Sequence, residues 1–182
     1  MDSGPYTGEI SASMIKSCGC KLVELAHAER FKYFNETNEV VNKKISQSLK
    51  YNLTPLVCIG EQKKIISISM RKEILFGKIK IFFKKINLKE NQKIILAYEP
   101  IWTIGKSKSA DVDYVAETAD FIREVGLKIL KIKKNQLKVI YGGSVNIHNA
   151  KKLLNINQLD GIFIGRSAIK AKDFIKICQM VD

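Results

Sequence analysis

The chain has 182 residues, of which 46% are hydrophobic and 8% aromatic, a composition that is typical of one soluble globular domain and excludes a disordered chain. Its net charge of +13 comes mostly from lysines spread over all the helical segments without an aromatic-rich basic patch, so we expect no nucleic-acid partner. No apolar run is long enough to span a bilayer, no signal-peptide pattern is present, and the spacing of the four cysteines fits neither a zinc site nor a disulfide framework. We therefore expect a reduced, cytoplasmic protein without a metal ion or a membrane contact.

Short β-rich apolar runs alternate along the chain with longer helical patterns. A short helix is predicted over 11–17, and amphipathic helices over Asn38–Lys50 and 113–132. Five strands are predicted, over 21–26, 55–59, 93–98, 138–141 and 161–164. Because these strands are apolar throughout and separated by helices, they indicate a parallel sheet covered on both faces, in a single domain over 1–182.

Polar groups stand where each of the five strands ends. His27 follows the first strand, Glu61 the second and Glu99 the third, and the turns at 142–144 and 165–167 follow the last two. An open doubly wound sheet would gather its ligand groups near one switch point. Contributions from five successive strand ends instead favour a barrel, whose active site is built from all of its βα loops.

Glu99 and His27 are the sharpest candidates for chemistry. Burial at the mouth of a barrel would raise the pKa of the Glu99 carboxyl and suit it to proton abstraction, whereas a structural glutamate paired with a lysine is the open alternative. His27 precedes a predicted helix start, where a neutral imidazole is expected to polarise a carbonyl. A histidine that only caps a helix is the alternative there.

Glycine-containing loops supply the rest of the candidate site. The stretch "IWTIGKSKSA" after Glu99 has the character of a lid with a hinge at each end. "YGGS" (141–144) and "IGRS" (164–167) are predicted to follow strands and open helices, where backbone N–H groups bind an oxyanion. Ordinary tight turns are the alternative.

Six motifs carry a resemblance to a known family. "PYTGEIS", "AHAERF", "LTPLVCIGE", "AYEPIWTIG", "YGGSV" and "DGIFIGRSA" resemble, in order and in spacing, the motifs of the triosephosphate isomerases. The resemblance implies an α/β fold of the TIM (β/α)8-barrel family. It also implies the interconversion of dihydroxyacetone phosphate and glyceraldehyde 3-phosphate through an enediolate, in glycolysis and gluconeogenesis, with no metal or organic cofactor.

The resemblance also implies roles for single residues. Glu99 matches the base, His27 the electrophile that polarises the carbonyl, and Glu29 a carboxylate beside them. The residues that match phosphate-binding positions are Gly105, Ser144, Gly165 and Arg166. Those that match the lid and its apolar clamp are Trp102, Ile104 and Phe163. The loop that reaches into a neighbouring subunit of a homodimer is matched by Thr7 and Glu9.

Several positions depart from the family pattern. Ala28 replaces a serine after the histidine, and Phe31 replaces an arginine. Lys106 and Ser107 stand in the lid where threonine and glycine are common. Arg166 replaces the second glycine of the phosphate loop, where it could add a phosphate contact or crowd the pocket.

The resemblance covers only strands four to eight of the family barrel. We therefore expect about five βα units, without the first three and without the asparagine and lysine that the family places on strand one. An active isomerase is the first hypothesis. A catalytically impaired remnant that binds phosphate or acts as a scaffold is the second, and a basic RNA-associated protein is ranked last. With an incomplete wall, we expect the inward side chains to be uncovered, among them Val23, Val57, Ile95 and Val139.

Overall fold

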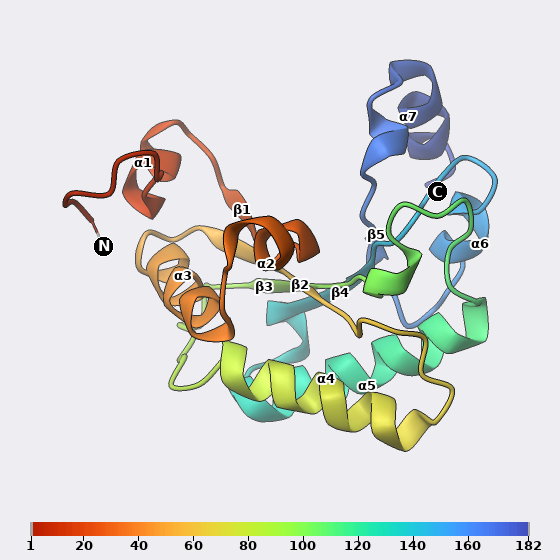
Figure 1. Ribbon diagram of the computed structural model, residues 1–182, viewed down its shortest axis with the longest axis horizontal. Coiled ribbons are helices and arrows are strands. Elements are labelled where there is room, and N and C mark those ends of the chain that lie inside the picture. Colours follow the sequence, from red (N-terminus) through yellow and green to blue (C-terminus); the bar gives the residue numbers. More distant parts are fainter. Residues whose placement is uncertain (1, 182) are drawn as a thin grey trace.

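The computed structural model describes residues 2–181 and contains one five-stranded parallel sheet. Its strands lie in chain order, so that each pairs with the next along the sequence (Figure 1). They are β1 (Leu22–Leu25), β2 (Thr54–Ile59), β3 (Ile94–Tyr98), β4 (Leu137–Tyr141) and β5 (Gly161–Ile162). All five predicted strands are confirmed, although the last is shorter than expected.

Helices connect the strands, and several begin at a side-chain cap. They are α1 (Ala12–Ser17), α2 (Ala28–Phe34), α3 (Asn38–Lys50), α4 (Ile68–Phe82), α5 (Val112–Leu130), α6 (Ala150–Leu154) and α7 (Ala171–Cys178), with short 3-10 turns η1 (Ile101–Thr103), η2 (Lys134–Gln136) and η3 (Arg166–Ala168). Ser11, Thr37 and Ser67 each accept a hydrogen bond from a backbone N–H in the first turn, which satisfies a donor that the helix leaves free. The predicted helices at 11–17, Asn38–Lys50 and 113–132 are confirmed within two residues.

The sequence analysis did not single out α4. Its apolar residues lie on both sides of the helix, since Leu75 and Ile79 are buried while Met70 and Ile74 are exposed. A helix without one apolar face gives no clear 3.6-residue periodicity.

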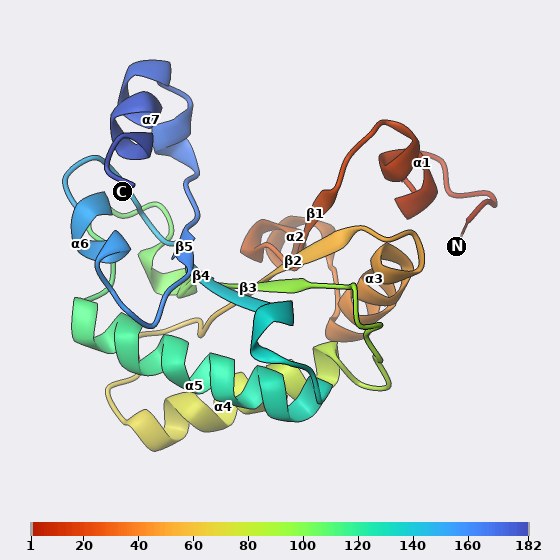
Figure 2. The ribbon, with the colours of Figure 1, turned by 180° about the vertical axis from the view of Figure 1, so that it is seen from behind.

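The two faces of the sheet are packed differently. Val57, Leu96 and Val139 stand in register across three strands and are fully buried in the main core, on the side covered by α3, α4 and α5 (Figures 1 and 2). Because side chains alternate along a strand, their neighbours in sequence form a separate, smaller cluster on the opposite face: Leu56, Cys58 and Ala97, with Ile95, Ile140 and Phe163 against it.

The expected set of inward side chains was therefore wrong in three of its four members. Val23, Val57 and Val139 belong to the main core on the helix-covered face, and only Ile95 lies on the face that leads to the strand-end site. Counting back from Glu99 in steps of two gives Ala97 and Ile95, but the same count from His27 and Glu61 gives Val23 and Val57, so the strand-end residues alone do not assign the face.

The sheet remains open within residues 2–181. β1 pairs only with β2, and β5 only with β4, so each outer strand leaves one side without a strand partner in this part of the chain. This agrees with an α/β fold that holds five βα units of an incomplete barrel. In the same range, no helix is both long and apolar enough to cross a membrane.

Candidate active site

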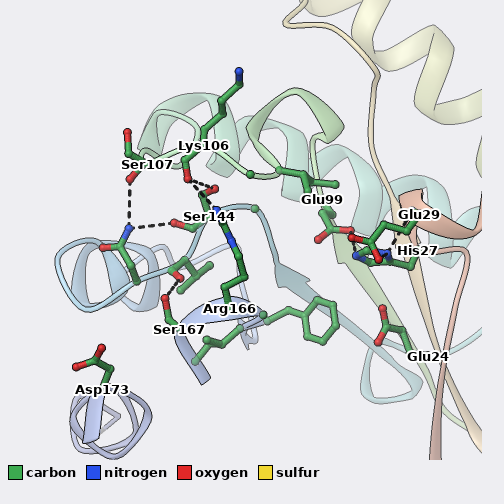
Figure 3. A pocket seen from close by; sticks show the side chains of 18 of the residues that line it. Glu24, His27, Glu29, Glu99, Lys106, Ser107, Ser144, Arg166, Ser167 and Asp173 are labelled. Carbon is green, nitrogen blue, oxygen red and sulfur yellow. Dashed lines mark hydrogen bonds and ion pairs between the residues drawn. The ribbon is translucent and has the colours of Figure 1, made fainter. Parts of the chain in front are cut away.

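A cleft of about 1090 Å³ lies at the carboxyl ends of the strands. It brings together nine of the predicted site residues: His27, Glu29, Glu99, Ile104, Gly105, Ser144, Phe163, Gly165 and Arg166. Figure 3 shows Glu99, His27 and Glu29 close together at one end, with Ser144 and Arg166 farther along the cleft. Trp102, Thr7 and Glu9 are not among the residues that line the cleft.

Glu99 follows β3 directly and is held against the end of β2. Its backbone N–H donates to the Ile59 carbonyl at 2.8 Å, and the glycine at position 60 allows this approach, because a Cβ there would lie 1.9 Å from the Glu99 carbonyl oxygen. Only 8% of the residue is exposed. Burial raises the pKa of the Glu99 carboxyl, with further upward contributions from the charges of Glu24 and Glu29 and an opposing one from His27. The expected direction of this shift is confirmed.

The His27 ring is oriented by the first turn of α2. Its Nδ1 accepts the Glu29 backbone N–H at 3.3 Å, so the proton of a neutral ring lies on Nε2. Nε2 stands 3.7 Å from Oε2 of Glu99. This separation is longer than a hydrogen bond, which leaves both groups available to a ligand between them. His27 thus caps a helix and also faces the carboxylate, so the two interpretations of this residue are compatible.

Three backbone N–H groups along the cleft are open to a ligand. Those of Gly105, Ser144 and Gly165 donate no hydrogen bond within residues 2–181. Gly165 precedes η3, as predicted for "IGRS", but "YGGS" was wrongly expected to open a helix directly, since α6 begins only at Ala150. Free N–H groups beside a cleft are suited to binding an oxyanion.

The lid is fastened to the loop that follows β4. Ser144 Oγ lies 2.7 Å from the carbonyl oxygens of both Thr103 and Lys106, and Arg166 Nη2 donates to the same Lys106 carbonyl at 3.3 Å. The Ala110 backbone N–H donates to the Tyr141 hydroxyl at 2.9 Å. The side chains of Ser144 and Arg166 therefore hold the lid in this structure.

Glycine at position 143 makes the contact between lid and loop possible. Gly143 has a φ of +115°, and a Cβ on it would lie 2.3 Å from Thr103 Oγ1. A larger residue would both strain the backbone and push the lid away.

Glu61 is not part of the cleft, contrary to its prediction as a strand-end site group. It is buried and accepts hydrogen bonds from Tyr98, Trp102 and Tyr114, with 2.8 Å between its Oε1 and Trp102 Nε1. Trp102 consequently lies behind the lid, at its first hinge. Glu61 is a positioning residue for that hinge.

Glu24 is a cleft residue that the sequence analysis missed. It lines the cleft below Glu99, and its Oε1 lies 3.8 Å from the buried Cys58 thiol (Figure 3). A single carboxylate within the apolar run "KLVELA" was the available signal.

A parallel sheet that places its polar groups at the carboxyl ends of the strands, under a hinged loop, is the architecture of the β/α-barrel enzymes. The chain is of that class. Comparison with known proteins narrows the class to one family.

The family model of triosephosphate isomerase matches residues 1–181. The triosephosphate isomerase of Mycoplasma mobile is 42% identical over 98% of this chain and 70% of that protein, and that of Chloroherpeton thalassium is 36% identical over 100% and 72%. The crystal structure of triosephosphate isomerase from Bartonella henselae superposes with a TM-score of 0.83 at 31% identity, over 99% of this chain and 73% of that one.

The chain therefore belongs to the triosephosphate isomerase family. It is an isomerase of dihydroxyacetone phosphate and glyceraldehyde 3-phosphate, with a role in glycolysis. The alternative of a non-catalytic remnant is not favoured by these similarities.

Proposed function

We propose that Glu99 is the base and His27 the electrophile of this isomerisation. Glu99 removes a proton from the carbon next to the substrate carbonyl, while His27 Nε2–H donates to the carbonyl oxygen and stabilises the enediolate. Glu99 then returns the proton to the neighbouring carbon, and the substrate's hydroxyl proton passes to the former carbonyl oxygen, which completes the exchange of ketone and aldehyde. The observation that carries the proposal is the 3.7 Å approach of His27 Nε2 to a buried carboxylate whose pKa is raised.

Glu29 is proposed to support the imidazole. Its backbone N–H donates to Nδ1 at 3.3 Å, and its carboxylate, 3.9 Å from the same ring nitrogen, makes no hydrogen bond to it. This arrangement keeps Nε2–H directed at the substrate. Ala28 carries no hydroxyl, so the ring depends on this backbone contact more than it would beside a serine.

The phosphate group is proposed to bind over Gly105, Ser144 and Gly165. Their free backbone N–H groups line one part of the cleft, and Arg166 adds positive charge beside them. Closing the lid then excludes water, and the apolar side chains of Ile104 and Phe163 cover Glu99.

The wider setting of the protein is also a proposal. We infer a cytoplasmic homodimer in which the exposed loop with Thr7 and Glu9 reaches into a neighbouring subunit. Residues 1–182 form a single domain that contributes five βα units of the family barrel. The chain's lysine excess gives a field that attracts a triose phosphate.

Replacing Glu99 by Gln tests the assignment of the base. We expect turnover to fall by about a thousandfold, because general-base catalysis contributes about 10²–10⁴-fold. Inorganic phosphate should still bind, and the circular dichroism spectrum should be unchanged. Glu90→Gln is the matched control, since Glu90 is an exposed carboxylate outside the cleft. If Glu99→Gln turns over as fast as Glu90→Gln, the assignment is wrong.

A further inference from the structure

The outward face of α4 carries a row of exposed apolar side chains. The opposite face packs Leu75, Ile79 and Phe82 into the main core. Three large apolar side chains on the outward face are 58%, 40% and 37% exposed: Met70, Ile74 and Ile81. Such a row on a soluble domain indicates a contact surface when its members are contiguous.

The open face of α4 does not result from a missing neighbouring helix. α4 packs against β2 on its inner side and against α3 and α5 on its flanks (Figure 1). All three of these elements are present, and within residues 2–181 none covers the outward side. The face would therefore remain open whatever surrounds the outer strands of the sheet.

The spacing of the row is that of a helix–helix seam. Met70, Ile74, Gly77 and Ile81 follow one another at intervals of four, three and four residues. This is the a/d spacing of a coiled-coil contact. Gly77 stands at its centre, and a Cβ built on Gly77 would meet no atom within 4 Å, so a second helix can approach closely there.

Opposite charges flank the seam on one side. Glu73 and Lys80 are both exposed, and neither forms an ion pair among the described residues. The cations on the other flank are already engaged, because Lys78 donates to the Gly60 carbonyl and Arg71 pairs with Glu117. Glu73 and Lys80 are thus the charges available to a partner.

We propose that α4 docks on α4 of a second copy of this chain, antiparallel and about a twofold axis at Gly77. With a rise of about 1.5 Å per residue, Glu73 lies about 6 Å from the axis on one side and Lys80 about 4.5 Å on the other. The twofold operation therefore places Glu73 beside Lys80 of the second copy, twice. It also packs Ile74 against Ile81 of the second copy. An isologous contact of this kind closes after two copies.

This contact is independent of the catalytic assignments and of the dimer proposed through Thr7 and Glu9. A single pair of helices of 15 residues makes a small interface, so we expect reversible association that depends on protein concentration.

Sedimentation velocity over a range of concentrations tests the seam. Ile74→Lys is expected to weaken the association by about tenfold or more, because it places a charge at the buried centre of the contact. Phe76→Lys is the matched control: Phe76 is 41% exposed but lies about 120° around the helix from Met70. Equal association by the two variants, or none by the unmodified chain, overturns the proposal.

Cross-linking tests the position of the axis. In a background with Cys18, Cys20 and Cys178 changed to serine, Gly77→Cys should form a disulfide between two copies under mild oxidation, and Phe76→Cys should not. Comparable cross-linking at both positions would mean non-specific contact and would overturn the seam.

A charge exchange tests the orientation of the two helices. Glu73→Lys alone should weaken association a few-fold by placing lysines side by side, and Glu73→Lys with Lys80→Glu should restore it. A double variant no better than Glu73→Lys would exclude the antiparallel pairing. Association that requires added RNA or anionic vesicles would instead point to a different partner and refute the self-contact.

Discussion

At the residue scale, the buried carboxylate of Glu99 destabilises the folded protein. Burial raises the pKa of its carboxyl, so the folded protein holds the charged form less favourably than the unfolded chain does. The charged carboxylate therefore lowers the free energy of unfolding at pH values above its folded pKa. A site kept at such a cost is consistent with use of the carboxylate as a base.

Glu24→Gln should shift the pH dependence of catalysis. The Glu24 charge contributes to the raised pKa of Glu99, so removing it lowers that pKa. Because the base must be deprotonated, the acid limb of kcat/KM is expected to move to lower pH. Asp173→Asn is the control, since Asp173 lines the cleft but is not among the groups that shift Glu99. If the acid limb of kcat/KM moves equally in Glu24→Gln and Asp173→Asn, Glu24 has no specific effect on the pKa of Glu99.

Ala26→Gly is expected to stabilise the protein. Ala26 precedes His27 with a φ of +63°, a left-handed conformation that costs a residue with a Cβ about 1–2 kcal/mol. Glycine relieves this strain, but it is more flexible when unfolded and loses a buried methyl group, so we expect a net gain of at most about 0.5 kcal/mol in chemical denaturation. Ala28→Gly, two residues further along and at the first position of α2, should destabilise. The free energy of unfolding should rise in Ala26→Gly and fall in Ala28→Gly, and a fall in both variants would contradict the prediction.

The sequence predicted the site residues better than their contacts. Glu99, His27 and the glycine turns were found because their positions at strand ends are read directly from the apolar pattern. Glu61 has the same position, yet it turns into a buried network, because the hydroxyls of Tyr98 and Tyr114 and the Trp102 indole meet it there. Donors that come from segments 37 to 53 residues away cannot be inferred from local pattern.

At the scale of elements, the lid depends on hydrogen bonds from the end of β4 and from the loop after it. Tyr141 is the anchor at the far hinge, where its hydroxyl accepts the buried Ala110 N–H. A buried N–H group needs a hydrogen-bond acceptor, so this lid conformation depends on the Tyr141 hydroxyl.

Tyr141→Phe should open the lid. It leaves the Ala110 N–H without an acceptor, which costs about 1–3 kcal/mol in the lid conformation of this structure. We therefore expect kcat/KM to fall by about tenfold or more, with faster proteolysis in the lid, and the global unfolding transition little changed. Tyr33→Phe is a suitable comparison, since Tyr33 is 63% exposed and lies on α2, outside the lid. Unchanged lid proteolysis in Tyr141→Phe would contradict the anchor role.

Elements with one apolar face were predictable, and those with two were not. α3 and α5 show clear periodicity because one side packs on the sheet and the other meets water. α4 is apolar on both sides, and its outward row forms the proposed seam between two copies. The failure of prediction at α4 thus has the same physical cause as the proposed contact.

At the scale of the whole molecule, the open sheet is the dominant feature. The sequence predicted five parallel strands in order, and the pairing confirms this. The number of units and the family followed from motif order. The assignment of side chains to the two faces did not, because it depends on a register that shifts every side chain when it is misjudged by one residue.

The last prediction concerns the 182-residue chain purified by itself. β1 and β5 each present one unpaired edge within the described residues, and Leu22 on β1 is 43% exposed. Open parallel edges with apolar side chains favour pairing between chains. We therefore expect slow association into species larger than a dimer, which light scattering would detect as distinct from the reversible dimer step that Ile74→Lys weakens.

Turnover of that chain should also be well below that of the relatives. The resemblance assigns a lysine on the family's first strand to the substrate, and loss of one such preorganised charge costs about 3 kcal/mol, or about a hundredfold in rate. The cleft would also be open to water on the side of β1, which weakens the electrostatic interactions of Glu99 and His27 with the substrate. A chimera that places the first three strand–helix units of the Mycoplasma mobile relative before Met1 should reverse both effects. A well-behaved monomer or dimer of the 182-residue chain, turning over as fast as the chimera, would show that five βα units suffice for the reaction.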